Sequence, residues 1–259
     1  MTRNQSCAAI AASSAFIVGA SVVQASFVGF FVSSNQVSLG GNNLIVYTLT
    51  ARFDESSDTV FRALDLYTEN AAWLEGFWHK DNHGNPATNG LLSQEFGTWN
   101  PRRTGSVTAN RPYDSYLTIG GIARPSNVTQ VEGAWFDGNK NTPRVWDQAD
   151  LPMGNGFSWY NEESSSVYLG DEIAQGRAGN SPGVAPTDVR LGQFVLSEGH
   201  EARTFSMSIM YRSGYSLSDD DEYGFETGSG TFTLGDPIPG PSALALSAIA
   251  GLLSRSRRR

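Results

Sequence analysis

The chain has 259 residues, of which 39% are hydrophobic and 17% charged, a composition that excludes a disordered polyelectrolyte and suits one large domain. Residues 26–236 carry 13 of the 18 basic and all 26 acidic residues, a net charge of −13, which disfavours nucleic-acid binding and suits divalent cations or neutral sugars better. The single cysteine, Cys7, precedes this segment, so the core of the domain must supply stability without disulfides.

Residues 1–25 have the features of a cleavable signal peptide. Arg3 supplies a positive charge, and the stretch Cys7–Val23 is apolar and rich in small residues. Small or aliphatic residues occupy positions −3 and −1 of a cut between Ala25 and Ser26, which is the predicted cleavage site. A cut after Ala20 and a buried element of the fold are the alternatives. Export through the translocon and processing by signal peptidase follow from the first interpretation.

Two segments alternate in hydrophobicity with the period of a half-buried strand. Residues 43–53 place Ile45, Tyr47 and Leu49 on one face, and residues 205–211 repeat the pattern. A polar turn after Phe53 predicts that residues 59–68 return as the hairpin partner of 43–53.

Shorter runs predict further strands, and no long helical stripe occurs between residues 26 and 236. The shorter candidate strands are 115–119, 133–136, 165–169, 190–196 and 231–234. Residues 78–104 and 138–157 are predicted surface loops. We therefore expect a single all-β domain over 26–236, an antiparallel sandwich or jelly roll. A signal helix and a short apolar C-terminal helix are expected to flank it.

The histidines give a weak indication of a metal site. His79 and His83 are four residues apart, a spacing that ligates zinc on a helix. Turn-forming neighbours and the absence of a third ligand favour two exposed loop histidines instead. His200 lies in a polar stretch that predicts a hairpin turn.

Catalytic motifs are lacking, so no catalytic residue is assigned. The chain has no nucleophile elbow, phosphate loop or dinucleotide fingerprint. A pair of carboxylates for glycoside hydrolysis depends on spatial separation. The available acids are Asp114, Glu132, Glu162, Glu163, Asp171 and Glu172.

Calcium is the most plausible cofactor, although none is required. Asp137, Asn139 and Asn141 occupy positions one, three and five of an oxygen-rich loop, but positions six and twelve lack the expected glycine and acid. Asp219 and Asp221 lie in a second acidic run, and such runs are usually solvated turns.

Four tryptophans in loop-like contexts could contact a sugar. They are Trp78, Trp99, Trp146 and Trp159. An exposed indole ring stacks well on amphipathic ligands. The alternative, which we favour, is that these rings cap the core.

The C-terminal segment 237–259 has three consecutive parts. Pro239 and Pro241 lie in a stretch that can be neither helix nor central strand. Residues 242–253 are uncharged, and as a helix they span about 18 Å, short of the ~30 Å hydrocarbon core. The chain ends in a basic cluster that resists translocation. The cluster contains Arg255, Arg257, Arg258 and Arg259.

This tail resembles the PEP-CTERM sorting signal of exported bacterial proteins, in which a Pro-Glu-Pro motif precedes an apolar helix and an arginine cluster. Pro239 and Pro241 match the two prolines, and Gly240 takes the place of the acid. The resemblance implies recognition by an exosortase, often in bacteria that make exopolysaccharide. A tail anchor and a disordered basic tail are the alternatives.

We therefore expect a non-enzymatic structural or interaction protein that is extracytoplasmic. It would attach transiently to the membrane through residues 242–253 and end in the cell envelope or extracellular matrix. A carbohydrate-binding module, assisted by calcium or not, is the first alternative. A polysaccharide hydrolase or lyase is the second.

Overall fold

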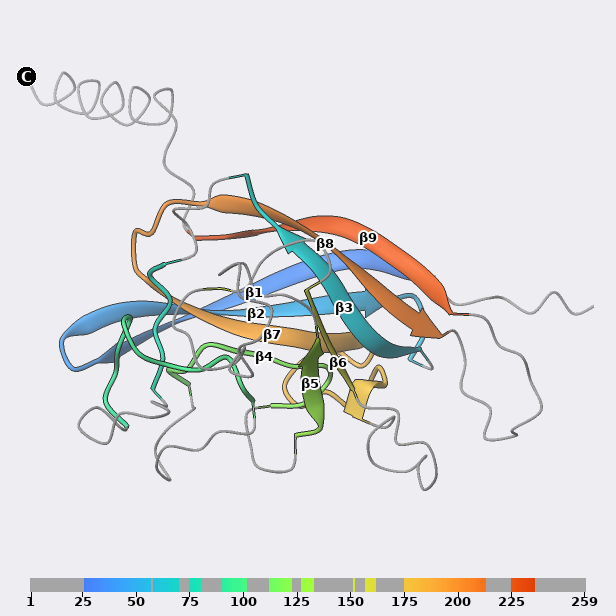
Figure 1. The fold of residues 1–259 in the computed structure, drawn as a ribbon, viewed down its shortest axis with the longest axis horizontal. Coiled ribbons are helices and arrows are strands. Elements are labelled where there is room, and N and C mark those ends of the chain that lie inside the picture. Colours follow the sequence, from blue (N-terminus) through green and yellow to red (C-terminus); the bar gives the residue numbers. More distant parts are fainter. Residues whose placement is uncertain are drawn as a thin grey trace, which may run out of the picture.

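The structure is a computed structural model of the chain. It describes residues 26–56, 58–69, 75–80, 90–101, 112–122, 127–132, 151, 157–161, 175–212 and 225–235. The predicted signal peptide and sorting tail lie outside these residues. Within them the fold is all-β, with two antiparallel sheets and one short helical turn at 175–176 (Figure 1).

Four strands form the first sheet, sheet A, in the order β1-β2-β7-β4. Their bounds are β1 Phe27–Leu39, β2 Asn42–Phe53, β7 Asp188–Ser197 and β4 Tyr116–Leu117. The long β1–β2 hairpin turns at two glycines, residues 40 and 41, with φ of 61° and 85°. A two-residue hairpin turn with positive φ at both positions strongly favours glycine.

Five strands form the second sheet, sheet B, in the order β5-β6-β3-β8-β9. Their bounds are β5 Thr129–Glu132, β6 Ser158–Asn161, β3 Thr59–Tyr67, β8 Arg203–Arg212 and β9 Glu226–Leu234. Successive strands β8 and β9 pair directly, whereas β7 and β8 belong to different sheets. The chain therefore crosses between the sheets at residues 198–202.

The two sheets share one hydrophobic core. Alternate residues of β2, such as Leu49 and Phe53, belong to the same buried cluster as Phe205 and Ile209 of β8. Period-two alternation puts these side chains on one face of each strand. The predicted inward faces of residues 43–53 and 205–211 are thereby confirmed.

The opposite face of sheet A is also covered, in part by loop segments. Val46 of β2 and Val195 of β7 are buried there against Trp78 and Leu92. This second layer explains why β7 is buried along almost its whole length. The prediction that 78–104 is only a surface loop is therefore wrong, because parts of this segment pack on the sheet.

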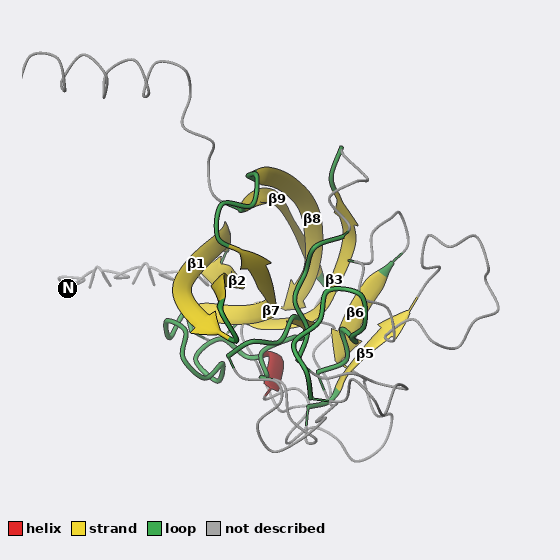
Figure 2. Ribbon diagram, turned by 90° about the vertical axis from the view of Figure 1, so that its left-hand side faces the viewer, coloured by secondary structure: helices red, strands yellow, loops and turns green. Residues whose placement is uncertain are grey.

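At one side of the molecule β1 lies beside β9 (Figures 1 and 2). Aromatic rings from β1 fill the space between these two strands. The Phe27 ring lies against Gly228, and the Phe30 ring lies against Gly230. A Cβ atom at residue 228 would come within 2.3 Å of Phe27 Cδ1. Glycine in β9 therefore provides the space that these rings occupy.

The predicted pairing of residues 59–68 with 43–53 is wrong. β2 pairs with β1 and β7, while β3 pairs with β6 and β8 in the other sheet. The polar turn after Phe53 leads from one sheet to the other.

His200 lies in a turn, as predicted. This turn is not a hairpin, because the strands that it connects, β7 and β8, belong to different sheets. The strands predicted at 133–136 and 165–169 lie outside the described residues.

We predict that Gly228→Ala lowers the free energy of unfolding by about 1–3 kcal/mol, because the methyl group forces Phe27 out of its place. Gly230→Ala is the matched control. Its Cβ would meet Phe30 Cδ2 at 3.2 Å, so a smaller effect is expected. Urea unfolding of both variants measures the difference. If Gly228→Ala were as stable as Gly230→Ala, the proposed packing at this side would be wrong.

Candidate functional site

His79 is part of the interior and not an exposed loop residue. Its side chain is 0% exposed and packs edge-on against Trp99, with 5.0 Å between ring centroids. Nδ1 lies 3.1 Å from the Ser115 carbonyl oxygen and 3.6 Å from Asp114 Oδ1. The expectation of an exposed histidine is therefore wrong: the loop that carries His79 folds onto sheet A. His83 lies outside the described residues.

Two of the four tryptophans proposed for sugar contact are fully buried. Trp99 and Trp159 are 0% exposed, and Trp159 Nε1–H donates to the carbonyl oxygens of Thr118 and Leu191. Neither ring can stack on a ligand, so the interpretation as core residues is confirmed for this pair. Trp78 is half-buried and donates to Ser197 Oγ at 3.0 Å. Trp146 lies outside the described residues.

A buried polar cluster joins the ends of several strands of both sheets. Thr129 Oγ–H donates to Asn161 Oδ1 at 3.0 Å, and Asn127 Nδ2–H donates to Thr118 Oγ1 at 2.8 Å. The Gln175 amide donates to the carbonyl oxygen of residue 119 at 2.8 Å. These side chains are neutral and hydrogen-bonded to one another, which makes the cluster a structural connection between these strand ends.

The acidic candidates do not form a site within the described residues. Asp114 is 1% exposed, and its carboxylate accepts a hydrogen bond from Lys80 N–H at 3.1 Å. No group of three or more His, Cys, Asp or Glu side chains in the described ranges is arranged to hold a metal ion. Nor does any helix in these ranges have the length and apolar character needed to cross a membrane.

The remaining candidate acids lie outside the described residues or, for Glu132, have no described side chain. Those outside are Glu162, Glu163, Asp171 and Glu172, with the calcium candidates Asp137, Asn139, Asn141, Asp219 and Asp221.

The outer face of sheet A holds the clearest ion pair. Arg52 binds Asp188 through two hydrogen bonds, of 2.7 and 2.9 Å, and Thr50 Oγ–H donates to the same carboxylate. The Arg52 guanidinium carbon lies 3.9 Å from the centroid of the Phe31 ring. A planar bidentate pair of this kind fixes the positions of the guanidinium and the carboxylate and neutralises both charges. The group connects three neighbouring strands and leaves no charge available for chemistry.

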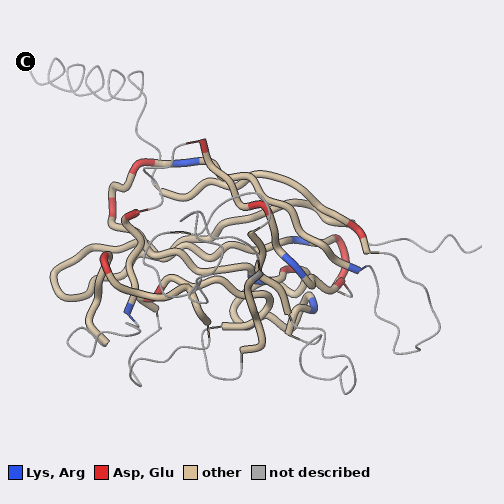
Figure 3. The backbone as a smooth tube through the Cα atoms, in the orientation of Figure 1, with Lys and Arg blue, Asp and Glu red and all other residues tan. Residues whose placement is uncertain are grey.

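Sheet B presents a different surface, which we call the hydroxyl face. It is formed by alternate residues of β8 and β9: Thr204, Ser206, Ser208, Ser229, Thr231 and Thr233. All six are exposed or half-exposed. The charged residues of these two strands are at their ends, as Figure 3 shows, so the face itself is uncharged.

Cross-strand pairs organise the hydroxyl face. Thr204 and Thr233 hydroxyls lie 3.2 Å apart, and those of Ser208 and Ser229 lie 2.8 Å apart. Between them Ser206 lies opposite Thr231 in the ladder.

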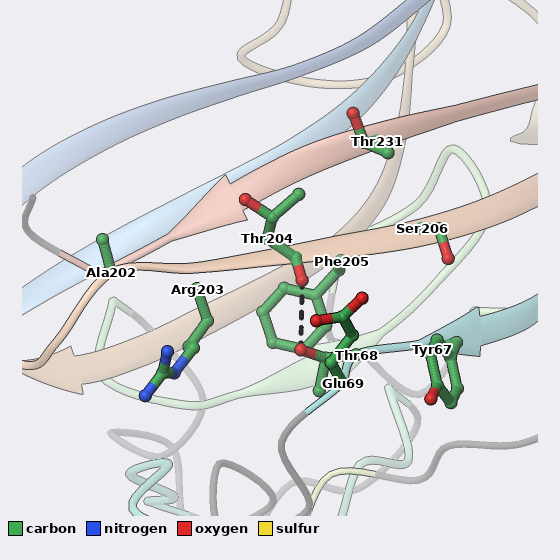
Figure 4. A pocket seen from close by; sticks show the side chains of 9 residues that line it. All are labelled: Tyr67, Thr68, Glu69, Ala202, Arg203, Thr204, Phe205, Ser206 and Thr231. Atoms are coloured by element: carbon green, nitrogen blue, oxygen red, sulfur yellow. Dashed lines mark hydrogen bonds between the residues drawn. The ribbon is translucent and has the colours of Figure 1, made fainter.

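A hollow of about 500 Å³ opens beside this middle pair, where β3 ends against β8. Ser206, Thr231 and the half-exposed Tyr67 line it, together with Glu69 and Arg203. Figure 4 shows Tyr67 and Arg203 on opposite sides, with the hydrogen bond from Thr68 Oγ to the Thr204 carbonyl between them.

Two charged residues, Glu69 and Arg203, line the hollow, and the rest of its lining is uncharged. Arg203 Nη2–H donates to Glu201 at 2.7 Å, so its charge is already paired. Glu69 is exposed to solvent. The site thus offers the aromatic ring of Tyr67, several hydroxyl groups and the solvent-exposed carboxylate of Glu69. This combination suits a neutral, hydroxyl-rich ligand.

No sequence motif marks this site. Serine and threonine in alternate positions of residues 203–212 and 226–234 are an ordinary sign of an exposed strand face. The register that places the two rows side by side, and the end of β3 that brings Tyr67 beside them, come only from the fold.

Comparison with known proteins adds no relative: no protein-family model, no curated protein and no solved structure matches the chain.

Proposed function

We propose that this chain is an exported protein of structural or interaction type that acts outside the cytoplasm, in the cell envelope or the extracellular matrix. Residues 26–236 form its exported domain, a β-sandwich of jelly-roll type. Residues 1–25 direct export and residues 237–259 sort the protein through the Pro239-x-Pro241 signal. No catalytic role is proposed.

The observation that supports this proposal is the position of the strands relative to the two predicted segments. The first strand begins at Phe27 and the last ends at Leu234. Both sheets, as described, are therefore made entirely of residues that lie between the proposed leader and the proposed tail.

The tail is proposed as the target of an exosortase-like enzyme. Its apolar segment, 242–253, is short for a permanent anchor, and the arginines that follow it resist export. A transient stop in the membrane followed by processing accounts for both properties.

The hollow on sheet B favours a second, compatible function, the binding of a neutral polysaccharide. Tyr67 is 52% exposed and supplies an aromatic ring, and the neighbouring hydroxyl face can donate and accept hydrogen bonds. Because Trp99 and Trp159 are buried, this function is proposed for Tyr67, Ser206 and Thr231 instead of those two tryptophans. Sugar contact by Trp78 or Trp146 stays a prediction. Calcium at Asp137 or Asp219 stays a prediction.

Deletion of residues 237–259 tests the sorting proposal. We expect the full chain to fractionate with the envelope or matrix and the truncated chain to lose that retention while still leaving the cytoplasm, because its leader is intact. Immunoblots of cytoplasmic, membrane and external fractions measure this. Cytoplasmic location of both forms would contradict export, and an unchanged distribution outside the cytoplasm would contradict sorting by the tail.

Tyr67→Ala tests the binding proposal. We expect its dissociation constant for a neutral polysaccharide to rise about 5–10-fold, which corresponds to the ~1 kcal/mol typical of an aromatic contact, while thermal stability is retained because the ring is half-exposed. Titration of polysaccharides identified on a glycan array measures the affinity.

Two variants serve as controls for this experiment. Tyr67→Phe keeps the ring and should bind much as the wild type does. Phe96→Ala removes another aromatic side chain of similar exposure, 44%, from a loop residue that does not line the hollow, and should bind normally. Equal affinities of Tyr67→Ala and the wild type would exclude the hollow as the binding site.

A further inference from the structure

Both sheets bind the first two residues of the exported domain. Ser26 N–H donates to Asp54 Oδ1 at 2.7 Å, Ser26 Oγ–H donates to Oδ2 at 3.1 Å, and Asp54 N–H donates back to the Ser26 carbonyl. Phe27 N–H donates to the Tyr211 hydroxyl at 3.4 Å, which in turn donates to Glu226 Oε2 at 2.9 Å. Asp54 follows β2 in sheet A, whereas Tyr211 and Glu226 belong to sheet B.

We propose that Asp54 is the core of an amino-terminal binding site, which holds the α-ammonium group that cleavage between Ala25 and Ser26 creates. Water adds across that peptide bond: the Ala25 carbonyl carbon takes the hydroxyl and leaves as a carboxylate, and the Ser26 nitrogen takes the protons and becomes an ammonium. The inference rests on the proposed export.

The geometry of the site suits the charged product better than the uncleaved chain. A Ser26 amide has one N–H donor, and it already points at Asp54. An ammonium in the same place has three donors and a positive charge, so a neutral donor is replaced by an ion pair with the same carboxylate. Cleavage thus strengthens an existing contact without rearranging the strand.

The site also distinguishes between the two cleavage positions that the sequence allows. A cut after Ala20 leaves five residues in front of Ser26, whose nitrogen stays an uncharged amide. Of the two cuts, the one between Ala25 and Ser26 creates its ammonium on the nitrogen that contacts Asp54. The structure therefore favours Ser26 as the first residue of the mature protein.

Charge pairing at this site has a defined pH window. The hydrogen bond from Ser26 N–H lowers the pKa of Asp54, so its contribution to stability is present above the ordinary pKa of an aspartate and is lost as the pH falls through the lowered value. Asp54 in turn should raise the pKa of the Ser26 ammonium above its usual value of about 7.7–8.0. That contribution is lost as the pH rises through the raised value. Both groups are therefore charged, and the ion pair complete, only at pH values between the lowered pKa of Asp54 and the raised pKa of the Ser26 ammonium.

The test is the pKa of the α-amino group on the exported, processed protein. Mass spectrometry first identifies the amino terminus, and the rate of acetylation of Ser26 as a function of pH then gives the pKa. The domain has only two lysines, Lys80 and Lys140, so few amines compete. We expect Asp54→Asn to lower the α-amino pKa by about 0.5–1 unit.

Glu55→Gln is the matched control, because it removes the same charge from the adjacent exposed residue and should change the pKa less. An exported protein that begins at a residue other than Ser26, or whose α-amino pKa is the same in wild type and Asp54→Asn, would overturn this inference and leave the proposed export intact. An uncleaved protein in the cytoplasm would overturn both.

Discussion

The position of Phe27 is the constraint on which the arrangement of the two sheets depends. Its ring packs against Phe30 and Phe53 from sheet A and against Tyr211 from sheet B, at centroid distances of 4.9–6.4 Å. Gly228 provides the space for it. Aromatic clusters of this kind bury a large apolar area in a domain that has no disulfide to hold it. The residue that begins β1 therefore also joins the sheets, which gives the start of this domain a structural role.

Sequence patterns predicted the strands that have one buried and one polar face. Residues 205–211 alternate strictly, and β8 follows that pattern. The pattern does not show which strands pair, because alternation indicates which side chains share a face of a strand but not which strand lies next to it. The turn after Phe53 therefore has the sequence character of a hairpin turn, although it leads to the other sheet. The actual hairpin of β2 turns at Gly40, and its glycine pair is a recognised hairpin signal that the prediction overlooked.

Burial in this protein depends on loops that no local pattern identifies. His79 and Trp99 occur among turn-forming residues, a context typical of the surface, yet both are enclosed. Trp99 belongs to the core that the two sheets share and packs against Phe194 of β7, and His79 packs against Trp99. The candidate site has the same origin. Tyr67 reaches the hollow because β3 ends beside β8, a long-range pairing that the sequence does not encode in any one segment. The proposed export and sorting signals, by contrast, are linear motifs, so their assignment does not depend on the fold and stays a prediction.

The contact between β1 and β9 consists of side chains, because no ladder of hydrogen bonds joins these two strands in the described part of the molecule. Hydrogen bonds therefore attach β9 along one edge only, the edge shared with β8. The proposed sorting tail follows β9 directly. Any mechanical load applied through that tail enters the domain at Leu234, and the β8–β9 ladder is the first set of hydrogen bonds to carry it. Tension between the cell surface and a bound polymer would thus be resisted by this pair of strands before it reaches the rest of the core.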